Sequence, residues 1–261
     1  MTTGSDFLTV VNALGLPPGA RVDARVPKKL LIEQGAPTVA DKRIIQEGID
    51  ELQWFAACKP ATIGVPTFVD DSREYLEIAV VGCAFRPPKD NKRSKVSRLI
   101  ELLHRAIPYP MLLITADEDG LAVSAAHKRH AQNEAGRTVI EQVVIASGLR
   151  ADAVDSAQVA FLKSLTLVQQ PRTDLFALYT GWIARIEAVN AARLTGAFAV
   201  TNDQEAIDRR RDALDAHTRL TKEIQGLRAK AKREKQLSRR VELNLEIRGR
   251  EADLAACIKQ L

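Results

Sequence analysis

Along residues 1–171 the spacing of apolar side chains changes several times, which is typical of a domain that mixes helices and strands. Residues 38–52 repeat isoleucine on one face of a helix, and Thr38 has the side chain of a good N-cap. Residues 91–107 repeat apolar side chains in the same way, and Pro108 would end that helix. Both segments are therefore predicted helices.

Three other segments carry the short apolar runs of buried strands, bounded by Pro, Gly or Asp. They are residues 51–59, 74–86 and 110–129. The last is predicted to be a hairpin, because Gly120 can supply the positive φ that a tight turn needs. Residues 19–35 are predicted to be extended, with a proline that favours a sheet edge or divides the segment in two.

The distribution of proline separates this part of the chain from the rest. All 11 prolines lie at or before Pro171, and the 90 residues after it contain none. A proline inside a helix costs about 3 kcal/mol, so a proline-free stretch of this length favours long helices. We predict an α+β protein with a mixed α/β domain over residues 1–171 and a helical region over residues 172–261. That region would end in a long coiled-coil-type helix over residues 203–261, with bends expected at Gly226 or Gly249.

Apolar residues recur in this last helix at the interrupted heptad spacing of a coiled coil. A small domain cannot cover so long a helix, so we expect the seam to pack on a helix from outside the chain. That helix would come from a second copy, which makes the protein a homo-oligomer, or from another protein subunit. The predicted seam residues are Leu220, Ile224, Leu227, Val241, Leu254 and Ile258.

A basic cluster interrupts the seam between residues 228 and 240, where Glu234 is the one acidic residue. Its cations are spread around the helix and do not share one face, which is weak evidence for a helix that reads a DNA groove. Three interpretations stay open: a solvated helix surface, a contact with the acidic surface of a partner, and a contact with the DNA backbone. The cluster contains Arg228, Lys230, Lys232, Arg233, Lys235, Arg239 and Arg240.

Composition narrows the classes of protein without selecting one. The formal net charge of +5 permits an acidic partner or nucleic acid but requires neither. Three cysteines far apart in the chain argue against a disulfide framework or a zinc site. The chain starts without a signal-peptide pattern and has no apolar run of about 18 residues, so we expect a cytoplasmic protein with no membrane span.

Catalytic motifs are missing or incomplete. The sequence has no glycine-rich phosphate loop, dinucleotide fingerprint or nucleophile motif, so we assign no catalytic residue, no cofactor and no metal. His127 and His130 form an HxxH pair that lacks further ligands. One enzymatic alternative is a diverged metal-dependent nuclease, whose chemistry needs acidic side chains with a lysine nearby. Its candidate residues are Asp70, Asp71, Glu74, Glu77 and Lys128.

Several segments together resemble an uncharacterised bacterial family, a domain of unknown function. They are "RVPKKLLIE", "TVADKRIIQEGIDELQWFAACKPATIGVP", "YLEIAVVGCAFR", "AIPYPMLLI", "SAAHKR" and "REKQLSRRVELNLEIRGRE". Members of that family are encoded beside helicases and DNA methyltransferases in restriction or phage-defence clusters. The resemblance therefore implies a non-catalytic accessory or assembly subunit of a DNA-processing complex, with a helicase or methyltransferase as partner. A non-specific nucleic-acid-binding protein is the remaining alternative.

Overall fold

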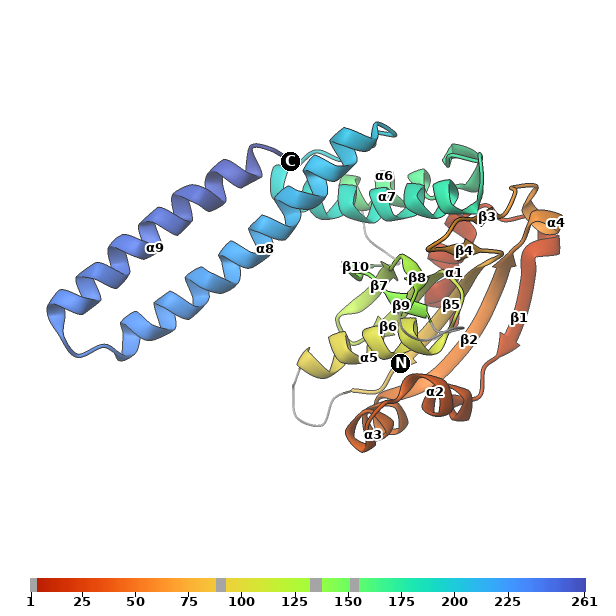
Figure 1. The fold of residues 1–261 in the computed structure, drawn as a ribbon, viewed down its shortest axis with the longest axis horizontal. Helices are drawn as coiled ribbons and strands as arrows, with labels where there is room; N and C mark the ends of the chain where they lie inside the picture. Colours follow the sequence, from red (N-terminus) through yellow and green to blue (C-terminus); the bar gives the residue numbers. More distant parts are fainter. Residues whose placement is uncertain (1–3, 88–92, 132–137, 151–154) are drawn as a thin grey trace. The chain divides into compact units, whose positions relative to one another are not determined.

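A computed structural model describes residues 4–87, 93–131, 138–150 and 155–261. Contacts divide the chain into two compact units, Met1–Ile186 and Glu187–Leu261, and the division lies inside helix α7 (Leu175–Thr195). The first unit holds the sheet and the second holds only helices, which confirms the predicted α+β class (Figure 1). The domain boundary near Pro171 stays a prediction. In the described part of the chain, no helix combines the length and the apolarity needed to cross a membrane.

A six-stranded sheet forms the centre of the first unit. Its strand order is β1-β2-β5-β6-β7-β10, in which β5 and β6 run parallel and every other neighbouring pair is antiparallel. Two short ribbons pair β3 with β4 and β8 with β9. The strands are β1 (Arg21–Arg25), β2 (Ile49–Cys58), β3 (Phe68–Val69), β4 (Glu74–Tyr75), β5 (Ile78–Phe85), β6 (Met111–Asp117), β7 (Gly120–Ala125), β8 (Lys128–His130), β9 (Thr138–Ile140) and β10 (Val144–Leu149).

Helices cover both faces of this sheet. Helices α2, α3 and α5 share a hydrophobic core with the side of β5 that carries Val81, and α1 covers the opposite side (Figure 1). On that opposite side a Cβ at Gly82 would lie 2.4 Å from the ring of Phe55 and 3.3 Å from that of Phe7, so only glycine leaves room for both rings. The helices of this unit are α1 (Gly4–Ala13), α2 (Lys28–Gly35), α3 (Val39–Gly48), α4 (Pro60–Ile63), α5 (Arg93–Ala106), α6 (Ser156–Ser164) and the first part of α7, with short 3₁₀ turns at Pro18–Ala20 and Leu167–Gln169.

Two local predictions in this unit are confirmed and one is wrong. The hydroxyl of Thr38 accepts a hydrogen bond from the backbone N–H of Asp41 at 3.1 Å and caps α3. Gly120 has a φ of +119° in the turn between β6 and β7. The second half of residues 19–35 is helical, because Pro27 stands at the N-cap of α2, where its missing N–H removes no helical hydrogen bond.

The second unit contains the last part of α7 and the helices α8 (Gln204–Arg233) and α9 (Leu237–Ile258). Helices α8 and α9 pair antiparallel as a helical hairpin (Figure 1). The connection is residues 234–236, where Glu234 Oε1 accepts a hydrogen bond from Gln236 N at 2.9 Å. Unbroken, the helix would place Lys235 one turn from Arg239, and like charges at that spacing destabilise a helix. The long C-terminal helix is thus confirmed for α8, but the expected bends at the two glycines are wrong.

The hairpin buries its own seam. Ile224, Ala231 and Ile247 form its core, and Leu227, Leu243 and Leu254 pack against them. Of the predicted seam residues, Leu220 and Ile224 are buried, while Leu227, Leu254 and Ile258 are half-buried. Val241 is the exception, since half of it is exposed. The two helices are therefore each other's partner, and these buried positions do not need a helix from outside the chain.

Candidate functional site

The residues predicted for a nuclease site do not assemble into a metal-binding group, although Glu74 and Lys128 line one pocket together with Tyr109 and His130. The carboxylate of Asp70 accepts hydrogen bonds from the backbone N–H groups of Ser72 and Arg73, which lower the pKa of Asp70. Glu77 lies 3.0 Å from the ammonium group of Lys59 instead. Asp71 and Glu74 are exposed. In the described ranges, no group of three or more His, Cys, Asp or Glu residues is arranged to hold a metal ion.

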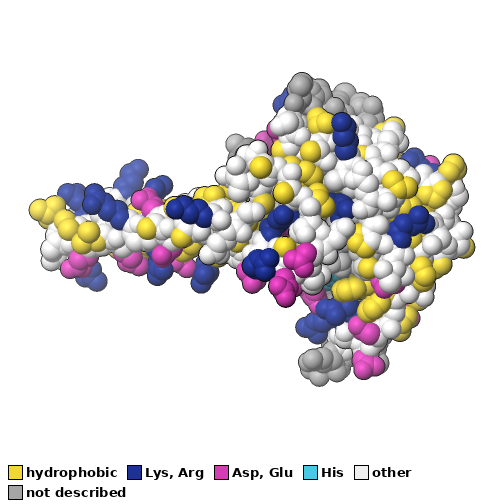
Figure 2. Space-filling model, turned by 90° about the horizontal axis from the view of Figure 1, so that it is seen from above, with side chains coloured by type: hydrophobic (Ala, Val, Ile, Leu, Met, Phe, Trp, Pro, Cys, Tyr) yellow, Lys and Arg dark blue, Asp and Glu magenta, His cyan; other side chains and the backbone are white. Residues whose placement is uncertain are grey.

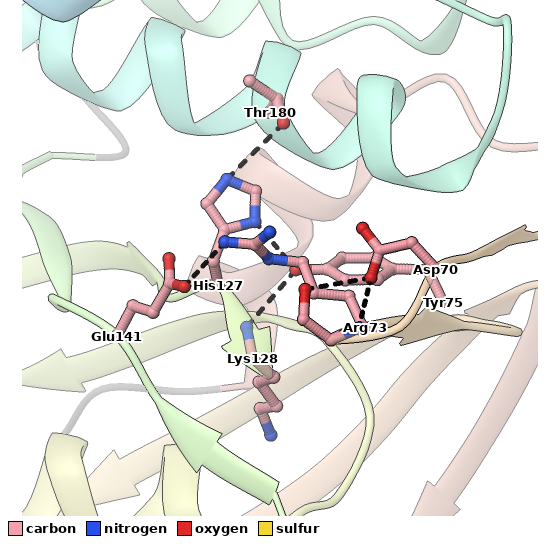
Figure 3. Close-up of polar contacts among 8 residues, drawn as sticks. Asp70, Arg73, Tyr75, His127, Lys128, Glu141 and Thr180 are labelled. Carbon is pink, nitrogen blue, oxygen red and sulfur yellow. Dashed lines mark hydrogen bonds and ion pairs between the residues drawn. The ribbon is translucent and has the colours of Figure 1, made fainter. Parts of the chain in front are cut away.

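Lys128, the fifth of these residues, has a structural position. Its ammonium group is buried at the end of α5, where it donates hydrogen bonds to the backbone oxygens of His104, at 2.7 Å, and Ile107. Burial lowers the pKa of Lys128 to about 7. An amine with a lowered pKa could act as a nucleophile, but this one is held on the last carbonyls of a helix, where a cation is favourable. In Figure 3 the side chain of Lys128 points away from the other labelled side chains, among them Asp70 and His127.

A second polar group surrounds His127 in the same unit (Figure 3). Tyr75 Oη accepts a hydrogen bond from Lys128 N at 3.3 Å and lies within hydrogen-bond distance of His127 Nδ1, at 2.7 Å. His127 Nε2 lies 3.5 Å from Thr180 Oγ1, and that hydroxyl donates to Phe176 O. Both ring nitrogens have partners, which leaves neither for a metal.

Aromatic rings and one ion pair close this group. The His127 ring centroid lies 4.9 Å from that of Phe176 and 5.5 Å from that of Tyr179. The guanidinium of Arg73 lies over the Phe176 ring at 5.4 Å and is 2.8 Å from Glu141 Oε1. Most polar atoms of this group are paired, although Arg73 Nε is buried without a hydrogen-bond partner. A side-chain group that is paired to this extent contributes mainly to the stability of the fold.

The end of the helical hairpin differs from the nuclease candidates and from the polar group around His127, because its charged side chains have no partners of opposite charge among the described residues. We call six residues the basic end: Lys230, Lys232, Arg233, Lys235, Arg239 and Arg240. All but one of the predicted basic cluster belong to it, since Arg228 is paired with Glu251 at 2.6 Å. None of the six forms an ion pair with any residue in the described part of the chain. Figure 2 shows Lys and Arg side chains beside hydrophobic ones at this end of the hairpin, at the left of the view.

Further along the hairpin, opposite charges are matched between the two helices. Besides the pair of Arg228 with Glu251, Arg250 lies 3.4 Å from Glu223. At the base of α8, Arg211 is 2.7 Å from the buried carboxylate of Glu187. Arg219, Lys222 and Arg248 also form no ion pair with a described residue, so unpaired cations occur along the hairpin as well. The basic end differs in density, because it holds six of them within residues 230–240.

An exposed apolar stripe begins at the same end. It consists of Leu237, Val241 and Leu245, which are 65%, 50% and 61% exposed and lie four residues apart along α9. Sequence reasoning placed Val241 in the seam because one long helix has a single apolar face to bury. The missed signal is that α9 carries two apolar series, since Leu243, Ile247 and Leu254 occupy the buried face.

Comparison with known proteins gives a family and no activity. The family model described as Domain of unknown function (DUF4391) matches residues 14–254. No curated protein and no solved structure matches the chain.

Proposed function

The chain belongs to the DUF4391 family, and we propose that it is a non-catalytic accessory subunit of a bacterial DNA restriction or phage-defence complex. In this proposal the helical hairpin holds a partner protein through the exposed apolar stripe. A helicase or a DNA methyltransferase is the partner that the resemblance of the sequence suggests. A cytoplasmic location and assembly into a homo-oligomer belong to the same proposal.

One observation carries the proposal, namely the stripe of Leu237, Val241 and Leu245 on a helix that already has a buried seam. Anchors spaced four residues apart are the pattern by which one helix packs on another protein. Removing three such side chains from water on binding would be favourable, because each is largely exposed in the free chain. The polar group around His127, by contrast, is mostly paired within the fold and has no comparable exposed apolar stripe.

The test is a pull-down with the purified products of the genes beside its own, using the full chain and a stripe variant, Leu237→Ser, Val241→Ser and Leu245→Ser. We expect the full chain to retain at least one product and the variant to lose at least about tenfold in affinity, as when anchor residues are truncated. A matched control replaces three exposed polar residues of α8, as Thr218→Ser, Lys222→Ser and Gln225→Ser, and should bind as the full chain does.

The mass of the chain in solution, from light scattering, separates the two kinds of partner. If a second copy covers the stripe, the full chain is a dimer or larger and the stripe variant is a monomer. The proposal is wrong if the full chain is a monomer and each gene product binds the full chain and the stripe variant with the same affinity.

A further inference from the structure

We propose that the basic end of the hairpin binds the phosphate backbone of duplex DNA without reading its sequence. The ligand is a nucleic acid and not a protein, so this inference adds a second binding surface to the apolar stripe. It is measured with the purified chain alone and therefore does not depend on the proposed function.

The stability of the hairpin explains only half of these cations. Lys230, Lys232 and Arg233 lie in the last turn of α8, where the helix dipole favours positive charge. Arg239 and Arg240 lie in the first turn of α9, where the dipole has the opposite effect, and that turn contains no acidic residue. Cations that the fold itself disfavours indicate a ligand that supplies the negative charge.

Local acids do not neutralise this charge. The one acidic residue among the cations, Glu234, uses its Oε1 to accept a hydrogen bond from Gln236 N. The cations come from the end of one helix, the connection and the start of the next, so they surround the hairpin end on several sides. A partner protein usually offers acidic groups on one face, whereas a duplex offers phosphates on both walls of a groove.

Dimensions agree with this ligand. A helix with its side chains is roughly 10–12 Å across, and the major groove of B-DNA is about 12 Å wide. A hairpin is one helix thick in one direction, so its end can approach a groove and place long Lys and Arg side chains toward both backbones. Because the charges surround the end, no single set of side chains faces the bases, and sequence preference is expected to be weak.

Fluorescence anisotropy of the full chain with a labelled duplex of about 25 base pairs and arbitrary sequence tests the inference. If all six cations neutralise phosphates, the logarithm of the association constant falls with the logarithm of salt concentration at a slope near about −5. Affinity would then fall roughly 10³-fold from about 50 mM to about 200 mM salt. A variant with Lys230→Gln, Lys235→Gln and Arg239→Gln should have a slope shallower by about 3.

The hairpin supplies its own matched control. Arg228→Gln and Arg250→Gln remove cations that already have carboxylate partners, so together they should leave the slope nearly unchanged. No binding at about 50 mM salt, or an equal loss of slope in this control, overturns the inference. Binding to polyglutamate with no binding to the duplex overturns it as well, in favour of an acidic protein surface.

The stripe variant distinguishes this inference from the proposed function. It should bind the duplex as the full chain does, because it keeps all six cations. If it loses the partner protein and keeps DNA, both proposals stand. If the full chain binds its partner protein but not DNA, only this inference falls.

Discussion

The polar group around His127 and the basic end of the hairpin are both rich in charged and polar side chains, but they differ in how those side chains are satisfied. In the first, His127 lies within hydrogen-bond distance of Tyr75 and of Thr180, and Arg73 is paired with Glu141. In the second, six cations have no partner within the described chain. A residue type therefore says little about function until its partners are known, since of the two histidines of HxxH only His127 is packed among other side chains while His130 is exposed.

The largest expected effect lies in the sheet unit. The hydroxyl of Tyr179 is fully buried and joins the start of β6 to the residue after β7, because it accepts a hydrogen bond from Ala126 N at 3.0 Å and donates to Met111 O at 2.8 Å. Tyr179→Phe removes this buried partner from both backbone groups and should lower the free energy of unfolding by about 3 kcal/mol. Urea denaturation measures the change. A loss below about 1 kcal/mol would show that water replaces the hydroxyl.

A matched pair within α9 compares its buried and exposed faces. Ile247→Ala removes a side chain from the hairpin core and should lower the free energy of unfolding by about 2 kcal/mol. Leu245→Ala removes a similar volume from the exposed stripe and should change it by less than about 0.5 kcal/mol. Thermal unfolding followed by circular dichroism measures both variants. Equal losses would mean that the stripe is covered in solution.

Acid should destabilise the sheet unit through His104. This residue is fully buried, with Nε2 3.0 Å from Ser124 Oγ, and burial lowers its pKa to about 3. The unfolded chain binds a proton below about pH 6.5 and the folded chain does not, so stability is complete above that pH and is lost as the pH falls. Between about pH 6.5 and pH 5 the loss should be about 1.5 kcal/mol.

The control for that pH dependence is His104→Gln, which keeps a polar side chain near Ser124 but has no group that titrates in this range. Its stability should be lower at neutral pH and should vary much less between about pH 6.5 and pH 5. The other histidines of the chain remain in this variant. An unchanged pH profile would assign the effect to them and not to His104.

The smallest expected change in the free energy of unfolding is a gain in stability. Arg239→Glu places a negative charge in the first turn of α9, where it is favourable, so it should raise the stability of the hairpin by about 0.5 kcal/mol. The same change should weaken binding of duplex DNA. Denaturation and anisotropy on one protein preparation measure the two effects. A variant that loses stability would show that Arg239 serves the fold.

Sequence periodicity was enough to predict the α+β class, the cap at Thr38 and the hairpin turn at Gly120, because each depends on neighbouring residues. It did not predict the break at residues 234–236, since no proline or glycine marks it. The basic cluster was found from composition, but its division into a paired Arg228 and unpaired neighbours required the position of Glu251 on the opposite helix. The burial of Lys128 was equally invisible, since its acceptors are backbone carbonyls.

The short connection between α8 and α9 also leads to an expectation about the order of folding. At the base of the hairpin, the thiol of Cys257 donates to Ala213 O, and these residues are 44 positions apart. In the sheet unit, Thr166 Oγ1 donates to Ala13 O across 153 positions. Local contacts close rapidly and distant ones slowly, so we expect the helical hairpin to form before the contact between Ala13 and Thr166.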